Sequence, residues 1–436
     1  MIPLLWRERL LEVAGPRQSG RVCRMIGLHL EIEGVDAAIG ESIHVQLSQR
    51  EEVVAEVVAV NDGRLICMPL GALDGLRYGA PATAMRRPPS FPVGRNLLGR
   101  VIDAEGRPLD GKGPIFPDAL VSVVNSPPEP MARRLISEQL SLGVRVLDTM
   151  VPCGRGQRIG VFAGAGVGKS TLLSMMIRGS AADVKVLSLV GERGREVKEF
   201  VENDLGDEGL RDAVVVVATS DQPPLLRIRA ALAATRLAEW FRDEGDDVLL
   251  IMDSLTRLAM AQREVGLSTG EPPSARGYPP STTSLMARLL ERAGNAAVGS
   301  ITGIYSVLVD GDDMSDPVAD SARSILDGHI TLSRHRAQLG RYPAVSVLES
   351  ISRLESAILT KEQRALALQV RSLLASLEQA QDLIDVGAYR SGSNPMVDRA
   401  LQILEPLETV FGQGVDELSN EVKAWEALRL AMEVVA

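Results

Sequence analysis

Aromatic residues make up only 3% of this 436-residue chain, and it holds three cysteines. Cys23, Cys67 and Cys153 lie far apart and show no metal-ligand spacing, so the pattern excludes a cysteine-based zinc site and favours reduced thiols. No apolar run approaches the roughly 18 residues of a membrane-spanning helix. The opening "MIPLLWRERLLEVAG" mixes acid and base into its apolar positions, unlike a signal peptide. We therefore expect a soluble, cytoplasmic protein.

A block of basic residues is also missing. The formal net charge is -10, and Lys and Arg are spread along the chain. A protein that binds the nucleic-acid backbone needs a basic footprint, so we expect no nucleic-acid partner. The hydrophobic content of 45% and charged content of 24% are typical of globular proteins, and the length suits two or three domains.

The pattern of apolar residues changes along the chain and predicts four parts. Residues 1–18 form an amphipathic segment, which is either a short helix over 3–14 or a frayed terminus. Residues 19–90 show short alternating runs broken by "NDG" and Gly-rich turns, which predict a small β-barrel. The Pro-rich stretch "RRPPSFPVG" reads as a linker to the next domain.

An α/β domain is predicted over residues 91–360. Its strand-like runs are continuously apolar, as in a parallel sheet that is buried on both faces: "QRIGVF", "VKVLSLV", "AVVVVATS", "DVLLIMD" and "ITGIYSVLVD". Stretches with helical spacing separate these runs, and such alternation indicates an α/β fold. Residues 361–436 are Leu/Ala-rich and predict a helical C-terminal domain.

The stretch "AGAGVGKST" follows the run "QRIGVF" and fits the phosphate-binding P-loop, with alanine in place of the first glycine. We expect it to bind nucleotide phosphates through Ala163, Gly164, Ala165, Gly166, Val167, Gly168, Lys169, Ser170 and Thr171. Glycines allow the backbone N–H groups to wrap a phosphate, and the next helix offers its positive N-terminus. Lys169 would contact the β- and γ-phosphates, and Ser170 would bind Mg²⁺.

Two carboxylates at the ends of apolar runs complete the predicted chemistry. Asp253 ends "DVLLIMD" and is the expected Mg²⁺ partner, because ligands bind at the carboxyl ends of parallel strands. Glu192 follows "VKVLSLVG", where it could take a proton from the attacking water. Position alone leaves open that Glu192 is a solvated residue of a charged turn.

Five stretches together resemble the ATPase of type III protein export, which drives flagellar assembly and virulence injectisomes. They are "FAGAGVGKST", "VGERGREVKEF", "VLLIMDSLTRLAMAQREVGLSTGEPPSARGYPPS", "SVLVDGDDMSDPVADSARSILDGHI" and "GRYPAVSVLESISR". This family is similar to the catalytic β subunit of rotary ATP synthases. The resemblance implies an N-terminal β-barrel, a RecA-like P-loop ATPase core and a C-terminal helical domain, with ATP and Mg²⁺ bound.

The resemblance also implies roles for charged residues. Glu192 matches the carboxylate that polarises water, and Arg193 beside it matches a neighbour of the γ-phosphate. Arg257 matches a further active-site arginine, and Arg353 matches the arginine finger that reaches the nucleotide of a neighbouring subunit.

Two aromatic residues are implied around the adenine. Tyr342, in "GRYPAV", matches the residue that stacks on the base, and Phe411, in "VFGQG", is a weaker match for its other side.

The family's partners are implied in the same way. They are a homohexameric ring, a stator or regulator protein at the N-terminus, a central stalk protein, the export gate and chaperone–substrate complexes. The resemblance further implies a position at the inner-membrane face of the export apparatus, with peripheral membrane association.

Other functions compete with export. A non-catalytic nucleotide-binding subunit would lack the glutamate at the position of Glu192. A ring-shaped nucleic-acid motor would show aromatic stacking platforms in its small domain, whereas residues 21–86 hold one Tyr and no Phe or Trp. A rotary synthase subunit resembles the motifs less closely. The stretch "DLIDVGAYRSGSNPMVDRAL" favours a flagellar over an injectisome member, and the sequence leaves both open.

Overall fold

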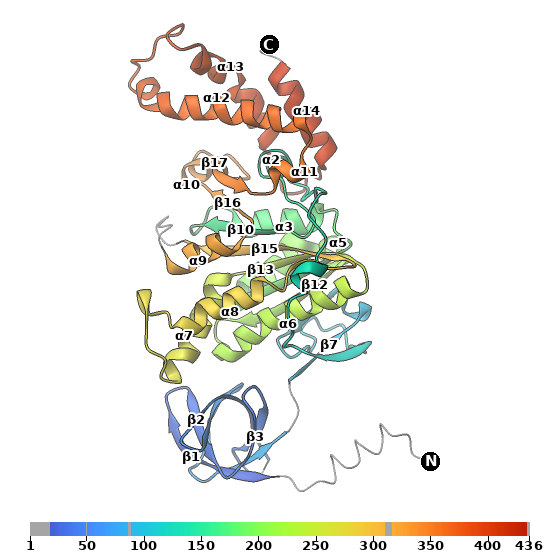
Figure 1. The fold of residues 1–436 in the computed structure, drawn as a ribbon, viewed down its shortest axis with the longest axis vertical. Helices are drawn as coiled ribbons and strands as arrows, with labels where there is room; N and C mark the ends of the chain where they lie inside the picture. The colour runs from blue at the N-terminus through green and yellow to red at the C-terminus, as the bar shows by residue number, and fades with distance from the viewer. Residues whose placement is uncertain (1–17, 49, 86–88, 310–315, 434–436) are drawn as a thin grey trace.

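The chain folds into a β-barrel, an α/β core and a C-terminal helical domain, stacked along the long axis of the molecule (Figure 1). The structure is a computed structural model, and it describes residues 18–48, 50–85, 89–309 and 316–433. The predicted fold class is confirmed. The domain boundaries after residues 90 and 360 stay predictions. The predicted amphipathic segment lies outside the described residues except for Gln18.

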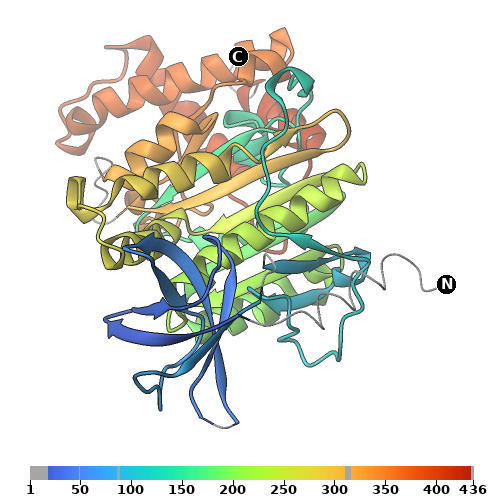
Figure 2. The same cartoon turned by 60° about the horizontal axis from the view of Figure 1, so that its bottom comes forward.

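The barrel closes in the strand order β1-β2-β5-β4-β3-β6 and is turned forward in Figure 2. Alternate residues point inward, as Val53, Ala55 and Val57 do along one strand, because a β-strand has a period of two. The barrel strands are β1 (Ser19–Ile26), β2 (His29–Glu33), β3 (Ser42–Gln46), β4 (Glu52–Asn61), β5 (Arg64–Pro69) and β6 (Pro81–Ala84).

The core is built on one nine-stranded sheet. Its strands are β8 (Arg100–Asp103), β10 (Arg158–Ala163), β11 (Val184–Glu192), β12 (Ala213–Thr219), β13 (Asp247–Asp253), β14 (Gly294–Asn295), β15 (Ser300–Leu308), β16 (Gly328–Leu332) and β17 (Val345–Ser352). The order is β17-β16-β10-β15-β13-β11-β12-β8, with β14 paired to β15. All five strand-like runs named from the sequence are strands of this sheet. The sheet is parallel except for β14 and β17, which pair antiparallel to their neighbours. The apolar pattern of the sequence did not reveal these two antiparallel strands. A separate ribbon pairs β7 (Ser90–Val93) with β9 (Ala119–Ser122).

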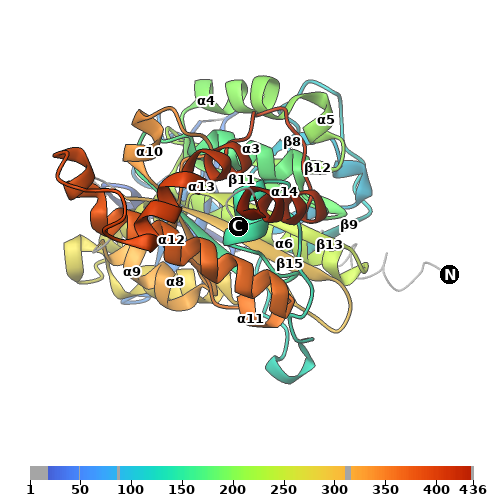
Figure 3. The ribbon, with the colours of Figure 1, turned by 90° about the horizontal axis from the view of Figure 1, so that it is seen from above.

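Helices cover both faces of the sheet, which explains why its strands are apolar throughout. The helices of the core are α2 (Arg145–Met150), α3 (Lys169–Gly179), α4 (Gly194–Glu199), α5 (Gly206–Leu210), α6 (Pro224–Asp243), α7 (Leu255–Ser268), α8 (Pro280–Leu290), α9 (Pro317–Ile325), α10 (Arg334–Gln338) and α11 (Glu355–Ile358). Four short turns accompany them: η1 (Arg95–Leu97), η2 (Pro130–Ala132), the π-helical η3 (Phe200–Leu205) and η4 (Ala275–Gly277). Seen from the C-terminal end, α3, α4 and α5 lie on one side of the sheet and α8 and α9 on the other (Figure 3).

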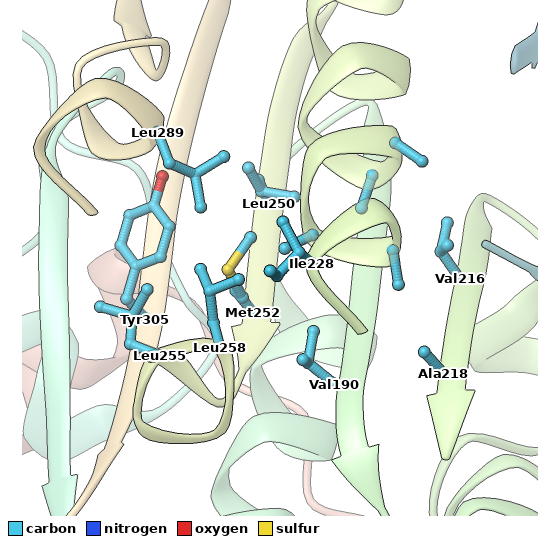
Figure 4. Packing of buried hydrophobic residues seen from close by; sticks show 14 of the residues in the cluster. Val190, Val216, Ala218, Ile228, Leu250, Met252, Leu255, Leu258, Leu289 and Tyr305 are labelled. Carbon is cyan, nitrogen blue, oxygen red and sulfur yellow. The ribbon is translucent and has the colours of Figure 1, made fainter. Parts of the chain in front are cut away.

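One buried cluster joins the sheet to helices α6, α7 and α8 (Figure 4). Ile228 of α6 and Leu258 of α7 pack there beside Leu250 and Met252 of β13. A second cluster joins the other face of the sheet to α2, α3 and the three C-terminal helices, α12 (Lys361–Asp385), α13 (Pro395–Phe411) and α14 (Glu421–Glu433). The helical domain is therefore fixed to the core on the P-loop helix's side. No helix within the described residues has a stretch long and apolar enough to cross a membrane.

A buried ion pair links α6 to the turn that follows α8. Arg292 donates to both oxygens of Glu239, at 2.7 and 2.9 Å, and both side chains are buried. We expect Arg292→Ala to lower the free energy of unfolding by about 3 kcal/mol, because a buried carboxylate loses its main partner. Chemical denaturation measures this loss. Arg24→Ala, on the exposed barrel surface, is the control and should change stability by less than about 0.5 kcal/mol. An Arg292→Ala protein as stable as the control would show that the pair adds nothing.

Candidate active site

The P-loop connects the end of β10 to the start of α3. Gly166 and Gly168 adopt φ values of 75° and 89°, which residues with a β-carbon rarely adopt, so glycine is required at both. Val167 between them is buried and anchors the loop. The backbone N–H groups at the N-terminus of α3 are thereby directed at one site, which suits an anion.

Asp253 ends β13, two strands away from β10 in the sheet. Its carboxylate is buried and contacts the Lys169 ammonium, and Ser306 of β15 donates a hydrogen bond to it at 2.6 Å. Sequence reasoning missed Ser306. Its signal was a polar residue within a strand that is otherwise buried and apolar.

Glu192 ends β11, the strand beside β13, where Leu189 pairs in register with Asp253. The Arg257 guanidinium lies 3.2 and 3.5 Å from its two carboxylate oxygens. Burial raises the pKa of the Glu192 carboxyl, and the Asp253 charge raises it further, while Lys169 and Arg257 oppose this shift. The group is therefore a stronger base than an exposed glutamate.

These side chains meet at one cavity of about 160 Å³. Ser170, Glu192 and Asp253 all line it, so the structure brings together the predicted metal and water-activating residues. Arg193 is not among the residues lining this cavity. Its side chain is exposed and forms an ion pair with Glu196 at 3.1 Å.

Tyr342 lies against the P-loop. A β-carbon added at Gly168 would be 3.3 Å from Cε1 of its ring, and 46% of the residue is exposed. The Gln413 N–H donates to the Tyr342 carbonyl at 3.1 Å, which holds this position beside the helical domain. Phe411 is only 3% exposed and packs in the hydrophobic core, so its burial counts against the adenine contact expected for it.

Arg353 lies near the end of the sheet where the parallel strands begin, whereas the P-loop lies at the end where they finish. It follows β17, which runs antiparallel to β16, and its N–H donates to the Asp327 carbonyl. Asp327 in turn binds Arg158, the first residue of β10, whereas the P-loop follows the last. At 3.3 Å per residue, the length of β10 separates Arg353 from its own P-loop by about 17 Å.

Comparison with known proteins places this geometry in a family. The ATP synthase alpha/beta family, nucleotide-binding domain, matches residues 143–352, and the T3SS EscN ATPase C-terminal domain matches residues 359–429. The flagellum-specific ATP synthase of Bacillus subtilis (strain 168) is 48% identical over 405 residues, which cover 92% of each chain.

Two solved structures share the whole architecture. The assembled ATPase EscN of the enteropathogenic E. coli type III secretion system superposes with a TM-score of 0.90 at 40% identity, covering 95% of this chain and 100% of that one. EscN in complex with its central stalk EscO superposes with a TM-score of 0.87 at 39% identity and the same coverage. The chain belongs to the family of flagellum-specific and type III secretion ATPases, and it is an ATPase of that family.

Proposed function

We propose that this chain hydrolyses ATP to ADP and phosphate with Mg²⁺, at a site that a second copy of the chain completes, and that hydrolysis energises flagellar protein export. The observation that carries the hydrolysis proposal is the single cavity shared by Ser170, Asp253 and Glu192 at the end of the P-loop. Purified chain should release phosphate from ATP, and chelation of Mg²⁺ should stop the release. Phosphate release unaffected by chelation would contradict the Mg²⁺ requirement.

The donor set fits Mg²⁺. Ser170 supplies a hydroxyl oxygen and Asp253 a carboxylate oxygen, and Mg²⁺ is held in proteins by one or two such groups together with substrate phosphates. The described residues contain no cluster of three His, Cys, Asp or Glu side chains that could hold a metal ion. When bound, Mg²⁺ neutralises charge that develops on the phosphates.

The remaining roles belong to side chains at the cavity. Lys169 is placed to exchange the Asp253 carboxylate for the phosphates, because it begins α3 directly after the P-loop glycines and its ammonium contacts Asp253. Glu192 accepts a proton from the attacking water, and Arg257 orients the Glu192 carboxylate through two contacts. Arg193 remains a proposed phosphate neighbour, which must leave its Glu196 pair to act.

The pH dependence of turnover follows from Glu192. The base works only when it is ionised, and its raised pKa means that it becomes protonated at a higher pH than an ordinary glutamate. An ordinary glutamate has a pKa of about 4.3. The acid limb of the kcat/KM profile should therefore lie at a pH above this value. Arg257→Gln removes a charge that lowers this pKa, so the acid limb should move to still higher pH. A limb that moves to lower pH, or does not move, would contradict the pairing.

Tyr342 is proposed to stack on the adenine, since its half-exposed ring lies against Gly168. Stacking binds substrate and transition state alike, so Tyr342→Ala should raise KM for ATP by about tenfold and leave kcat nearly unchanged. Tyr342→Phe keeps the ring and should behave as wild type. Steady-state kinetics of the two variants decide this, and a kcat loss at unchanged KM would exclude a stacking role. Phe411 would reach the adenine only if the core packing around its ring opened.

The position of Arg353 supports a ring. About 17 Å of sheet separates it from its own P-loop, which is longer than an arginine side chain, and this supports a role at another chain's nucleotide. Identical chains packed head to tail around a closed axis place every Arg353 at a neighbour's P-loop edge through one repeated interface. We propose a homohexamer. EscN has been solved as an assembled ATPase, which agrees with a multi-subunit form.

The proposed flagellar role has its support in the 48% identity to a flagellum-specific relative, against 46% to a type 3 secretion system ATPase of Xanthomonas euvesicatoria. By analogy with the EscN–EscO complex we propose a central stalk partner, together with an export gate and chaperone–substrate complexes. Residues 1–18 are proposed to bind a stator or regulator, with the chain in the cytoplasm at the inner membrane. Deletion of the gene should abolish flagellar filaments, and a fully motile deletion strain would contradict the flagellar role.

A further inference from the structure

A large groove lies away from the nucleotide site, between the core and the helical domain. It is a cavity of about 1100 Å³, bounded by α11, the N-terminal turn of α12, and α14. A smaller cavity of about 450 Å³ adjoins it and shares Ser137, Glu138 and Arg155. Asp247 and Ser300, which begin β13 and β15, line the smaller cavity. The groove therefore runs along the same edge of the sheet as Arg353.

The groove combines an apolar floor with acidic walls. Its apolar members are Ile358, Leu366, Val422 and Trp425. Four carboxylates line it, from Glu138, Glu362, Glu421 and Glu426, against two guanidinium groups, from Arg155 and Arg429. Asp247 pairs with Arg155 at 2.6 Å, which leaves the groove with a negative excess.

Two polar atoms in the groove lack partners. Trp425 is only 8% exposed, and within the described chain its indole N–H finds no acceptor. One carboxylate oxygen of Glu421, a turn earlier on α14, is also buried and unbonded there. A buried donor or acceptor without a partner costs about 1–3 kcal/mol, so a neighbouring chain that brought an acceptor and a donor to these two atoms would gain binding free energy.

The opposite edge of the molecule carries the complementary surface. Helix α10 follows β16 at the P-loop edge, and Figure 1 shows it beneath the C-terminal helices at the same level as α11. Between Asp327 and Glu349 the sequence has Arg334, Arg336 and Arg341 and no carboxylate. Arg336 and Arg341 share the single carboxylate of Glu408, so these three side chains keep a positive excess.

An apolar side chain projects from the centre of this basic surface. Leu339, in the turn after α10, is 53% exposed, and Gly340 turns the chain beside it with φ 70°. We define residues 334–341 as the basic turn. It combines an exposed apolar side chain with basic residues near it in the sequence, whereas the groove combines apolar and acidic side chains.

We propose that the groove of one chain receives the basic turn of the next chain in the ring, with Leu339 on the apolar floor and the arginines facing the carboxylates. This inference rests on the proposed head-to-tail ring, in which the edge that carries Arg353 meets a neighbour's P-loop edge. The basic turn ends one residue before Tyr342. The proposed contact would therefore join the adenine site of one chain to the helical domain of another.

The first test breaks each half of the contact separately. Leu339→Glu damages the turn and Val422→Glu damages the groove, and both positions are exposed, Val422 by 69%, so folding should be retained. Each variant should self-associate at least about 30-fold more weakly than wild type in sedimentation experiments, as for an interface hot spot. Leu383→Glu, at a position also 53% exposed on α12, is the matched control and should assemble normally.

Mixing the two variants gives a more specific outcome. The intact turn of the Val422→Glu chain fits the intact groove of the Leu339→Glu chain, and the other two surfaces are damaged. The mixture should therefore form a 1:1 dimer that does not grow into a ring. Should a variant fold poorly, Leu339→Cys mixed with Val422→Cys should form an inter-chain disulfide when a thiol oxidant is added, and Leu383→Cys mixed with Val422→Cys should not.

The possible results separate this inference from the ring itself. Wild-type chain that assembles, with both glutamate variants assembling equally well and no cross-link between positions 339 and 422, overturns the groove contact and leaves the ring intact. Wild-type chain that stays monomeric at every concentration, with full ATPase activity, overturns both.

Discussion

Glu192→Gln should bind ATP with nearly unchanged affinity and lose about 10²- to 10⁴-fold in kcat, the usual contribution of a positioned general base. The amide has the shape of the carboxylate but cannot accept the proton of the attacking water. Glu192 has the surroundings of such a base: it ends a buried strand, contacts Arg257 and lines the cavity of Ser170 and Asp253. Phosphate release measures the loss, and binding of a fluorescent ATP analogue checks that the site is intact.

The matched control for this substitution is Glu199→Gln. Glu199 lines the same cavity but is half exposed and forms a weak pair with Arg195 at 3.8 Å, so the same change of charge should leave kcat close to wild type. Equal losses in the two variants would mean that the cavity's total charge matters rather than a base at position 192. Wild-type kcat in Glu192→Gln would show that the base lies elsewhere.

Arg353→Ala should retain ATP binding and lose about 10³- to 10⁵-fold in kcat, the range found for arginine fingers in phosphoryl transfer. The arginine is exposed at the sheet edge, where its guanidinium donates to the Arg323 carbonyl, so its removal should not affect folding. The specific activity of the wild-type chain should rise with protein concentration, because more interfaces between chains form. Arg24→Ala is the control for loss of an exposed arginine and should keep full activity.

Much of the fold could be predicted because its signals are local. The run that became β13 is apolar throughout, since helices cover both faces of the sheet, and this pattern is visible in the sequence. The antiparallel pairing of β17 was not predictable in this way, because its direction is set by non-local contacts with β16. That pairing is what places Arg353 away from its own P-loop.

The residues of the candidate site also differ in how far local sequence signals reveal them. The P-loop glycines and Asp253 are identified by motif and by their place at strand ends. Ser306, which donates to Asp253, comes from a strand with no motif and meets it only through the sheet order. Phe411 illustrates the opposite case, where a short motif suggests an adenine contact, whereas packing in the buried core cluster encloses the ring.

The central claim is that the active site is shared between two chains, and mixing two inactive variants tests it most directly. Lys169→Ala cannot use nucleotide but keeps its Arg353, and Arg353→Ala has the reverse defect. In a mixed ring about one quarter of the boundaries join an intact P-loop to an intact arginine, so a matching fraction of wild-type activity should return. A mixture shown to co-assemble that stays as inactive as its two components would contradict the account.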